Sequence, residues 1–178
     1  MRVIAGIAKG VRLARPAGGT RPVSDRAREG VFSSLATLVE GARCLDLFAG
    51  TGAMGIEALS RGAASCTFVD SSAAAVRVIN ENLRRTKLDG TVLRAEAARF
   101  LARDQGAFDL VFLDPPYDIP AAALSEILAA LPSHLDGDAR FVLTRSARGS
   151  TDVVPVDFLI ERRLSYGDTL VLVCREDR

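Results

Sequence analysis

From Arg43 onward, short apolar runs alternate with stretches of helical periodicity, and this alternation restricts the possible folds more than any other feature. The apolar runs lie at residues 44–48, 66–70, 91–95, 108–113 and 140–144. The helical stretches lie near residues 53–61, 72–86, 97–104 and 121–131. Such alternation is typical of a parallel sheet with helices on both faces. Two final apolar runs are joined only by YGD (166–168), a spacing that suits a hairpin. We therefore predict an α/β fold with a mostly parallel seven-stranded sheet, an antiparallel C-terminal hairpin, and a ligand site at the carboxyl ends of the strands.

The composition favours one globular domain with a small appendage, because 48% of the 178 residues are hydrophobic and 25% are charged. No apolar run approaches ~18 residues, and the N-terminus lacks the apolar stretch of a secretory signal, so we expect a cytoplasmic protein without a membrane segment. The three cysteines are far apart and form no CxxC pair, so neither a disulfide nor a metal site is predicted. His134, the only histidine, lies in a polar stretch and is predicted to be a surface residue.

The first 40 residues are predicted to form an N-terminal extension, and residues 41–178 the sheet domain. Residues 2–6 and 11–14 resemble two short strands around the turn AKG. A helix is predicted to follow, capped by Ser24 and ended by Gly41. Because no core-sized apolar stripe precedes Val31, we expect this hairpin and helix to extend a self-sufficient domain.

Positive charge is concentrated in residues 1–28, which hold seven basic side chains and one acidic side chain, a net charge of +6. The other 150 residues then carry −5 of the total of +1. This segment is either an ordinary solvated terminus or an arm for a polyanion, because arginine binds phosphate bidentately. The predicted nucleic-acid contacts are Arg2, Lys9, Arg12, Arg15, Arg21, Arg26 and Arg28.

The turn after the first strand of the sheet, LDLFAGTGAMG (45–55), contains three glycines in the spacing G-x-G-x-x-G. Alone, this pattern also fits a dinucleotide site. Asp46 argues against a dinucleotide, because a carboxylate repels a pyrophosphate. It would instead attract the ammonium and sulfonium groups of S-adenosylmethionine, while the glycines allow close backbone approach.

Two further acidic residues end strands beside this loop. Asp70 is expected to accept hydrogen bonds from ribose hydroxyls, and Glu96 to meet the adenine amine. Each acid also has a structural alternative. Asp46 and Asp70 are suited to capping the next helix, and Glu96 could be an ordinary surface charge.

The run FLDPPY (112–117) ends the fourth strand of the sheet, and its residue types suit chemistry on an amine. An exocyclic amine of a nucleobase becomes more nucleophilic when acceptors hold its N–H groups. Asp114 supplies one acceptor, and the carbonyl of Pro115 supplies another in a direction that Pro116 restricts. Tyr117 offers a flat face on which an extruded base can stack.

DLFAGTG together with DPPY resembles the class I S-adenosylmethionine-dependent methyltransferases that act on amino groups of nucleic acids. RPVSDRAREGVF (21–32), the pattern of residues 6–16 and YGDT (166–169) narrow this resemblance. The chain is similar, over nearly its full length, to the bacterial 16S rRNA (guanine-966-N2)-methyltransferase family.

The resemblance implies a Rossmann-like methyltransferase fold and S-adenosylmethionine as cofactor. It implies 16S rRNA as substrate, within an assembling or assembled small ribosomal subunit. It implies catalysis at Asp114, Pro115, Pro116 and Tyr117. It implies cofactor contacts at Asp46, Phe48, Gly50, Gly52, Asp70, Ser71, Glu96, Ala97 and Asp114. No helix pattern shows a spare hydrophobic face, so a monomer is expected.

Three alternatives remain at this point. DPPY also suits a DNA adenine-N6 or protein-amide methyltransferase, although only about 40 residues are left here for a recognition region. The glycine pattern alone permits a nicotinamide-dependent oxidoreductase, which Asp46 disfavours. A non-catalytic RNA-binding module would leave the acidic strand ends unexplained.

Overall fold

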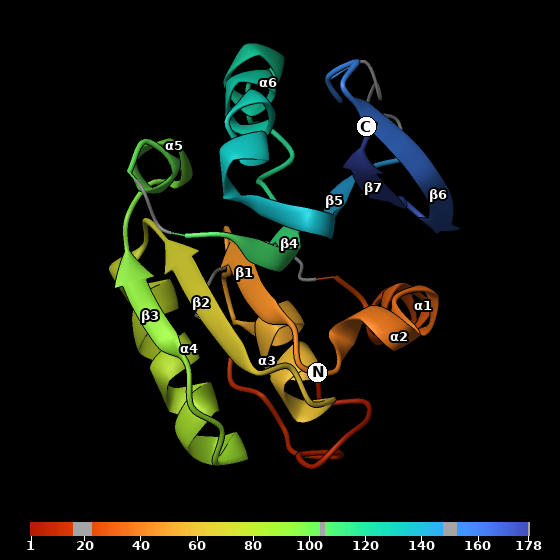
Figure 1. The fold of residues 1–178 in the computed structure, drawn as a ribbon. Coiled ribbons are helices and arrows are strands. Elements are labelled where there is room, and N and C mark those ends of the chain that lie inside the picture. The colour runs from red at the N-terminus through yellow and green to blue at the C-terminus, as the bar shows by residue number, and fades with distance from the viewer. Residues whose placement is uncertain (16–22, 104–105, 148–152, 178) are drawn as a thin grey trace.

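The computed structural model describes residues 1–15, 23–103, 106–147 and 153–177, and its centre is one seven-stranded sheet (Figure 1). The strands are β1 (Arg43–Leu47), β2 (Ser65–Asp70), β3 (Thr91–Arg94), β4 (Phe108–Leu113), β5 (Leu135–Ser146), β6 (Phe158–Tyr166) and β7 (Thr169–Glu176). Their order is β3-β2-β1-β4-β5-β7-β6. Strands β1 to β5 run parallel, whereas β7 is antiparallel to both β5 and β6. The predicted sheet and its antiparallel C-terminal hairpin are confirmed.

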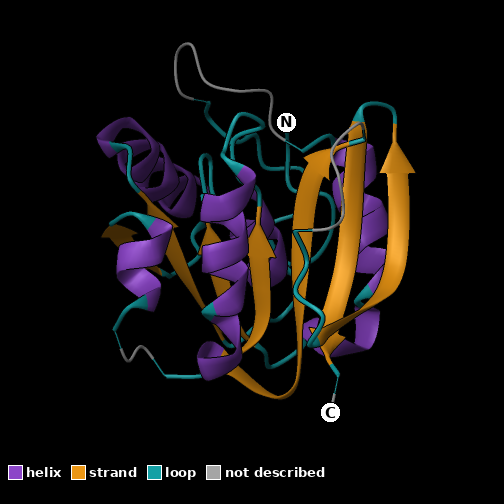
Figure 2. Cartoon of the chain, turned by 90° about the horizontal axis from the view of Figure 1, so that it is seen from above, coloured by secondary structure: helices purple, strands orange, loops and turns teal. Residues whose placement is uncertain are grey.

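Helices cover both faces of the sheet (Figures 1 and 2). They are α1 (Asp25–Ser34), α2 (Ala36–Val39), α3 (Ala53–Ser60), α4 (Ala73–Thr86), α5 (Ala97–Leu101), α6 (Ala121–Ala129) and the 3₁₀ helix η1 (Leu131–His134). Neighbouring strand residues point to opposite faces, so Cys44 joins the core beneath α1, α3 and α4, while Leu45 joins the core beneath α5 and α6. None of these helices is long and apolar enough to cross a membrane.

The strand order reverses at β1, which pairs with β2 on one side and β4 on the other. In an open parallel sheet, the connections after such a pair leave towards opposite faces and open a crevice at the carboxyl ends of the strands. The glycine turn follows β1 and FLDPPY ends β4. The topology therefore brings these two distant motifs to the same crevice.

The predicted helix after Ser24 is present, but it is divided at Leu35 into α1 and α2. The Ser24 cap is confirmed, since its hydroxyl accepts the backbone N–H of Ala27 at 3.2 Å. The hydroxyl of Ser34 donates to the carbonyl of Val31, an acceptor that the helix ladder also uses. The predicted hairpin before the helix is reduced to one antiparallel bridge between Arg2 and Arg12.

The first 14 residues lie along α3 and bury apolar side chains against it, so they are not a free arm on a self-sufficient domain. Val3, Ala8 and Leu13 belong to the same core as α3 and β1. Every residue of α3 is buried, although the helix lies on the outside of the sheet. The sequence did not indicate this packing, because the apolar residues here are scattered singly and form no stripe.

His134 also departs from its prediction as a surface residue. Its ring is 3% exposed and its Nε2 lies 2.8 Å from the carbonyl oxygen of Leu101. The polar stretch around it forms the end of η1 and the start of a long β5, which brings the ring under α5. A carbonyl partner requires Nε2 to donate, so this histidine has a structural role.

Candidate active site

The turn between β1 and α3 has a backbone that few sequences adopt. Phe48, Gly50 and Gly52 have positive φ angles of 58°, 55° and 74°. A positive φ is uncommon for a bulky residue such as Phe48 and marks a position that the surrounding structure holds under strain. The backbone N–H of Gly52 donates to Ala49 at 2.6 Å, which tightens the turn. An added Cβ at Gly50 would meet only the carbonyl oxygen of Phe48, at 3.8 Å, so a ligand could approach the backbone here.

Gly55, the third glycine of the pattern, allows α3 to pack closely on β2. An added Cβ would lie 2.3 Å from the ring of Phe68 and 2.5 Å from Sγ of Cys66. The backbone N–H of Gly55 donates to Oδ2 of Asp46 at 2.9 Å. Asp46 therefore joins the end of β1 to the first turn of α3, which is one of the two roles considered for it.

The second role of Asp46 depends on its charge. The side chain is 2% exposed, and burial raises its pKa well above the ordinary value, against the hydrogen bond from Gly55. The negative charges of Asp114 and Asp70 raise the pKa of Asp46 further. Within the described residues, no ion pair neutralises any of these three carboxyl groups. Such a cluster fits a cationic ligand and disfavours a pyrophosphate.

Asp70, at the end of β2, holds the glycine turn and the start of α4 together. Its Oδ2 accepts the backbone N–H of Gly50 at 2.8 Å, and its Oδ1 accepts that of Ser72, also at 2.8 Å. The side chain remains partly exposed. Ser71, which lies between Asp70 and Ser72 in the chain, is exposed, and its carbonyl accepts a hydrogen bond from the Arg94 side chain.

The four residues of DPPY leave the end of β4 beside this turn. Asp114 is half-buried, and burial raises its pKa to about 7. Pro115 is buried, whereas Pro116 is exposed. Tyr117 is 58% exposed, so its ring is open to an incoming group.

Tyr117 is linked to the C-terminal hairpin by its hydroxyl, which lies 3.5 Å from Oγ1 of Thr169. Thr169 begins β7 and pairs with both Tyr166 and Ser146. YGDT, predicted above as a hairpin connection and as part of a resemblance, therefore lies beside the DPPY segment. The contact of Thr169 with Tyr117 was not predicted.

Glu96 and Ala97 lie at the start of α5, on the far side of the crevice. Ala97 is buried, and Glu96 is exposed at the N-cap without a capping hydrogen bond from its side chain. Glu96 lines an open cavity of about 330 Å³ together with Leu93, Arg94, Ala95, Arg99, Phe100 and Arg103. Its carboxylate is free to meet a ligand, and three neighbouring arginines make the surroundings basic.

Asn82 in α4 connects the glycine turn to the N-terminal segment and was not predicted. It is fully buried, and its Nδ2 donates to the carbonyl of Thr51 at 2.9 Å. Its Oδ1 accepts the N–H of Ala14 at 2.7 Å, and Nδ2 also contacts the Ala14 carbonyl at 3.2 Å. The sequence carried a signal for it, because an asparagine stands here within the buried stripe of an amphipathic helix.

Arg28 corrects the predicted nucleic-acid contacts. Its side chain is 0% exposed. Its Nη2 donates to the carbonyl of Arg2 at 2.7 Å and to Asp25 at 2.8 Å, and its Nη1 lies 3.7 Å from Glu57. No phosphate can reach this guanidinium, which fastens the N-terminal segment to α1 and α3. We withdraw Arg28 from the set.

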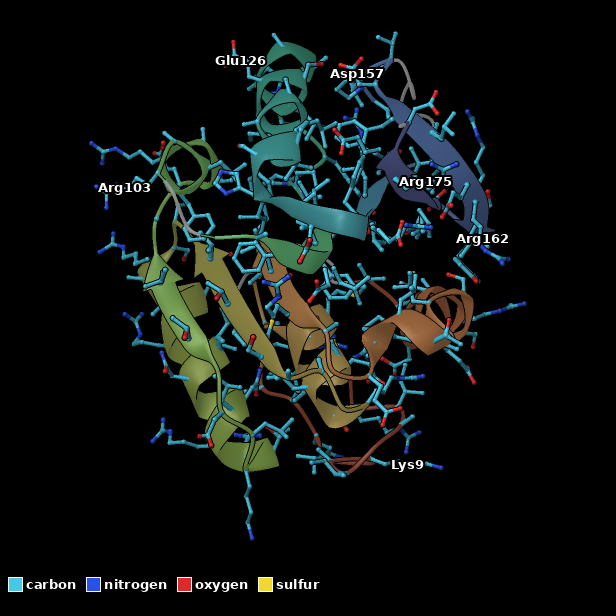
Figure 3. The ribbon with its side chains drawn as sticks, in the orientation of Figure 1. Lys9, Arg103, Glu126, Asp157, Arg162 and Arg175 are labelled. Carbon is cyan, nitrogen blue, oxygen red and sulfur yellow. The ribbon has the colours of Figure 1, made fainter. Side chains whose placement is uncertain are left out.

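The other predicted nucleic-acid contacts within the described residues are all exposed and form no ion pair there: Arg2, Lys9, Arg12, Arg15 and Arg26. Arg21 lies outside the described residues. The five are not equally close to the crevice. Ala8 contacts Ser60 at the last turn of α3, so Lys9 lies at the end of that helix remote from the glycine turn (Figure 3). Ala14 is hydrogen-bonded to Asn82, and this contact places the adjacent Arg15 nearer to the crevice.

Known proteins resemble this chain over nearly its whole length. The model of the family described as Conserved hypothetical protein 95 matches residues 1–175. The ribosomal RNA small subunit methyltransferase D of Escherichia coli (strain K12) is 40% identical over 171 residues, which cover 94% of this chain and 85% of that protein. A protein of Bacillus subtilis (strain 168), named "Putative rRNA methyltransferase YlbH", is 35% identical, with 99% of each chain covered.

The fold is also shared with solved structures. The structure named "Putative methyltransferase yhhF from Escherichia coli" superimposes with a TM-score of 0.89 at 30% identity, covering 99% of this chain and 98% of that chain. The fold is that of the Rossmann-like methyltransferases. On this similarity, the chain belongs to the Conserved hypothetical protein 95 family, the family of the bacterial small-subunit rRNA methyltransferase D proteins.

Proposed function

We propose that this protein transfers the methyl group of S-adenosylmethionine to the exocyclic N2 amine of a guanine in 16S rRNA. It would act as a cytoplasmic monomer on an assembling or assembled small ribosomal subunit. The observation that carries the proposal is the position of the DPPY segment, which ends β4 directly beside the glycine turn of β1. The names of the relatives support rRNA of the small subunit as the substrate class.

The residues at the crevice fit S-adenosylmethionine by charge and by shape. Asp46, Asp70 and Asp114 form a cluster of carboxyl groups without a basic partner among the described residues, and the cofactor brings an ammonium and a sulfonium. Gly50 leaves space for its approach to the backbone. When bound, the cofactor supplies an electrophilic methyl group. Asp70 would hold its ribose hydroxyls, and Glu96 and Ala97 its adenine, with Phe48, Gly52 and Ser71 completing the contacts.

The role of Asp70 gives a direct test of the cofactor site. Asp70→Lys should weaken S-adenosylmethionine binding sharply, because the change removes the ribose acceptor and adds a positive charge beside a cationic ligand. RNA affinity should change little. Calorimetry with each ligand measures both effects, and Glu126→Lys, an exposed charge change on α6 away from the crevice, is the matched control. Unchanged cofactor affinity in Asp70→Lys would remove this residue from the site.

Asp114 and Pro115 would activate the amine. The Asp114 carboxylate accepts one N–H of the guanine amine, and the Pro115 carbonyl accepts the other, which leaves the nitrogen lone pair free to face the methyl carbon. Pro116 restricts Pro115 to an extended backbone and so fixes the direction of that carbonyl. These bonds strengthen as positive charge develops on the nitrogen, so they act mainly in the transition state.

The bonding changes balance without a metal or a redox partner. One N–C bond forms at the guanine amine as the bond from sulfur to the methyl carbon breaks, and the electron pair of that bond returns to sulfur. The amine then holds one proton too many. Asp114 is placed to receive it as a carboxylate and to release it to solvent.

Tyr117 would hold the target base outside its RNA stack. An enzyme that modifies a base must extrude it from a helix or act on a single strand, and an aromatic face stabilises the extruded base. The Tyr117 ring is exposed, and its hydroxyl is anchored near Thr169. The ring is therefore presented beside Asp114 in a restricted orientation.

The proposed function is tested by transferring a labelled methyl group to small subunits purified from cells that lack this protein. We expect one guanine of 16S rRNA to become labelled, with the label on N2 in the digested nucleoside. Free 16S rRNA transcript and a DNA duplex serve as comparison substrates. Labelling of adenine in the duplex, with none in the subunit, would replace the proposal with the DNA adenine-N6 alternative.

A further inference from the structure

The outward face of α4 forms one side of an open groove, and Arg15 is the one lining residue that has been given a role above. The groove has a volume of about 610 Å³. It lies between α4 and the end of the N-terminal segment, and three arginines contribute to it. Its lining residues are Arg15, Ala74, Arg77, Val78, Asn80, Glu81 and Arg84.

The three arginines of the groove are available to a ligand. All three are exposed, and none forms an ion pair with another described residue. The single hydrogen bond among them, from Nε of Arg84 to the carbonyl of Asn80, is 3.4 Å long and leaves the rest of that guanidinium free. The acidic residue of the groove, Glu81, is paired with Arg85 one turn along the helix. The groove therefore keeps a strong positive charge.

The groove begins close to the candidate active site. Helix α4 starts after Ser72, whose N–H donates to Asp70, and Arg77 follows five residues later. At 1.5 Å per residue, Arg77 lies roughly 7 Å along the helix from that end, and Arg84 roughly 10 Å farther. Asn82 holds Ala14 against α4, which fixes the backbone that carries Arg15.

We propose that this groove binds the backbone of the RNA strand next to the target nucleotide, with Arg15, Arg77 and Arg84 contacting different phosphates. This inference rests on the proposed function and adds α4 to the RNA-binding surface. The guanidinium groups suit phosphate geometry. The separation of Arg77 from Arg84 exceeds the roughly 3.4 Å that one nucleotide advances along a helix axis, so the two reach different phosphates.

The expected contribution of the groove follows from counterion release. Each phosphate contact changes the slope of log affinity against log salt concentration by about 0.7–0.9. Two lost contacts should lower the slope by about 1.4–1.8. If the variant and the unaltered protein bind RNA equally at 1 M salt, the variant should bind roughly 25- to 60-fold more weakly at 0.1 M salt. Binding of S-adenosylmethionine should not change, because the groove lining contains none of the proposed cofactor contacts.

The experiment compares the full-length protein with the double variant Arg77→Gln/Arg84→Gln, using a 16S rRNA transcript and small subunits as probes across a salt series. The matched control is Arg162→Gln/Arg163→Gln, which removes the same charge from exposed positions of β6, at the opposite edge of the sheet (Figure 3). We expect the α4 variant to lose affinity and salt slope, with unchanged thermal stability, and the β6 variant to keep both. Equal slopes in the two variants would overturn the inference.

A failure of the groove differs from a failure of the proposed function. If the unaltered protein methylates 16S rRNA but the α4 variant binds it with unchanged slope, only the groove is wrong. If the unaltered protein neither methylates nor binds either RNA, the proposed function fails, and the groove inference falls with it. Inorganic phosphate that stabilises the unaltered protein as strongly as the transcript does would assign the groove to small anions and also overturn the inference.

Discussion

Asp114→Ala is expected to lower the rate of methyl transfer by about 10²-fold or more, because the amine loses an acceptor that acts mainly in the transition state. RNA affinity should stay nearly unchanged, since phosphate contacts supply most of it. Single-turnover transfer of a labelled methyl group measures the rate, and filter binding measures the affinity. Near-normal turnover in this variant would remove DPPY from the proposed mechanism.

The pH dependence of the reaction should report the same carboxyl group. Only the deprotonated Asp114 can take up the proton of the amine and stabilise its developing positive charge, and burial raises the pKa of Asp114 to about 7. Because its pKa is raised, Asp114 keeps its proton up to a higher pH than an ordinary carboxyl group. Activity should therefore be full above about pH 7 and should fall as the pH drops through that value. This acidic limb of the pH profile should appear in kcat/KM, which reports the pKa values of the free enzyme. The positive charge of bound S-adenosylmethionine favours the carboxylate and should move the limb of kcat to lower pH.

The Asp114→Asn variant distinguishes the role of residue 114 as a hydrogen-bond acceptor from the role of its negative charge. The amide keeps one oxygen that can accept the amine N–H but has no proton to lose in this range. This variant should therefore be slower than the unaltered protein and faster than Asp114→Ala, and the limb near pH 7 should disappear. An unchanged limb in Asp114→Asn would assign the titration to another group.

The sheet and its site could be predicted because their signals are local. The central strands of the parallel sheet contain apolar runs, and parallel strands buried on both faces read in this way, whereas the edge strand β3 is largely exposed. Once the strands are known to be parallel, their carboxyl ends share one edge. The residues at those ends, among them Asp46, Asp70 and Asp114, are then expected to lie close together. The electrostatic coupling of these three carboxyl groups agrees with that placement.

The N-terminal residues could not be placed by the same reasoning, because their partners are remote in the chain. Glu57, buried in α3, accepts the backbone N–H groups of Ile4 at 2.8 Å and Ala5 at 3.0 Å. Nothing in the sequence near residue 4 indicates this pairing. Arg28 was assigned from charge alone, but it precedes Phe32 and Leu35 at the spacing i, i+4, i+7. Its position on the apolar stripe of the helix indicated burial.

Removal of residues 1–14 is expected to unfold the protein, in contrast to the sequence-based expectation of a detachable arm. The deletion removes Val3 and Leu13, which are 1% and 6% exposed. Burying each such side chain contributes about 1.5–3 kcal/mol, so the two together account for about 3–6 kcal/mol. The total stability of a domain is typically only about 5–15 kcal/mol.

Polar groups add to this loss, because the deletion strips α3 and α4 of their hydrogen-bond partners. Glu57 loses the two backbone N–H groups that it accepts, and Asn82 loses Ala14. Ser60 loses the N–H of Ala8 and the carbonyl of Ala5. A buried polar group left without a partner costs about 1–3 kcal/mol. Thermal unfolding followed by circular dichroism should show no cooperative transition in the truncated protein.

A point change tests the same contact with the chain intact. Gly6 has a φ of 80°, and an added Cβ would lie 1.7 Å from the carbonyl oxygen of Ser60. Gly6→Val should therefore lift this segment from α3 and lower the melting temperature by several degrees, at roughly 2–4 °C for each kcal/mol lost. Gly10→Val is the matched control, since Gly10 has a similar φ of 87° but no atom within 4 Å of an added Cβ. Strain alone would destabilise both equally, so equal melting temperatures would show that the contact with α3 adds nothing.

The dependence of the fold on this segment changes how its arginines must be tested. Truncation would abolish RNA binding whether or not any arginine touches phosphate, because the whole domain would be lost. The triple variant Arg2→Gln/Lys9→Gln/Arg12→Gln keeps Val3, Ala8 and Leu13 in place and removes only exposed charge. Its melting temperature should stay unchanged, while the salt slope of RNA binding falls by about 0.7–0.9 for each residue that contacts phosphate. A slope equal to that of the unaltered protein would show that these three residues face solvent and contact no phosphate.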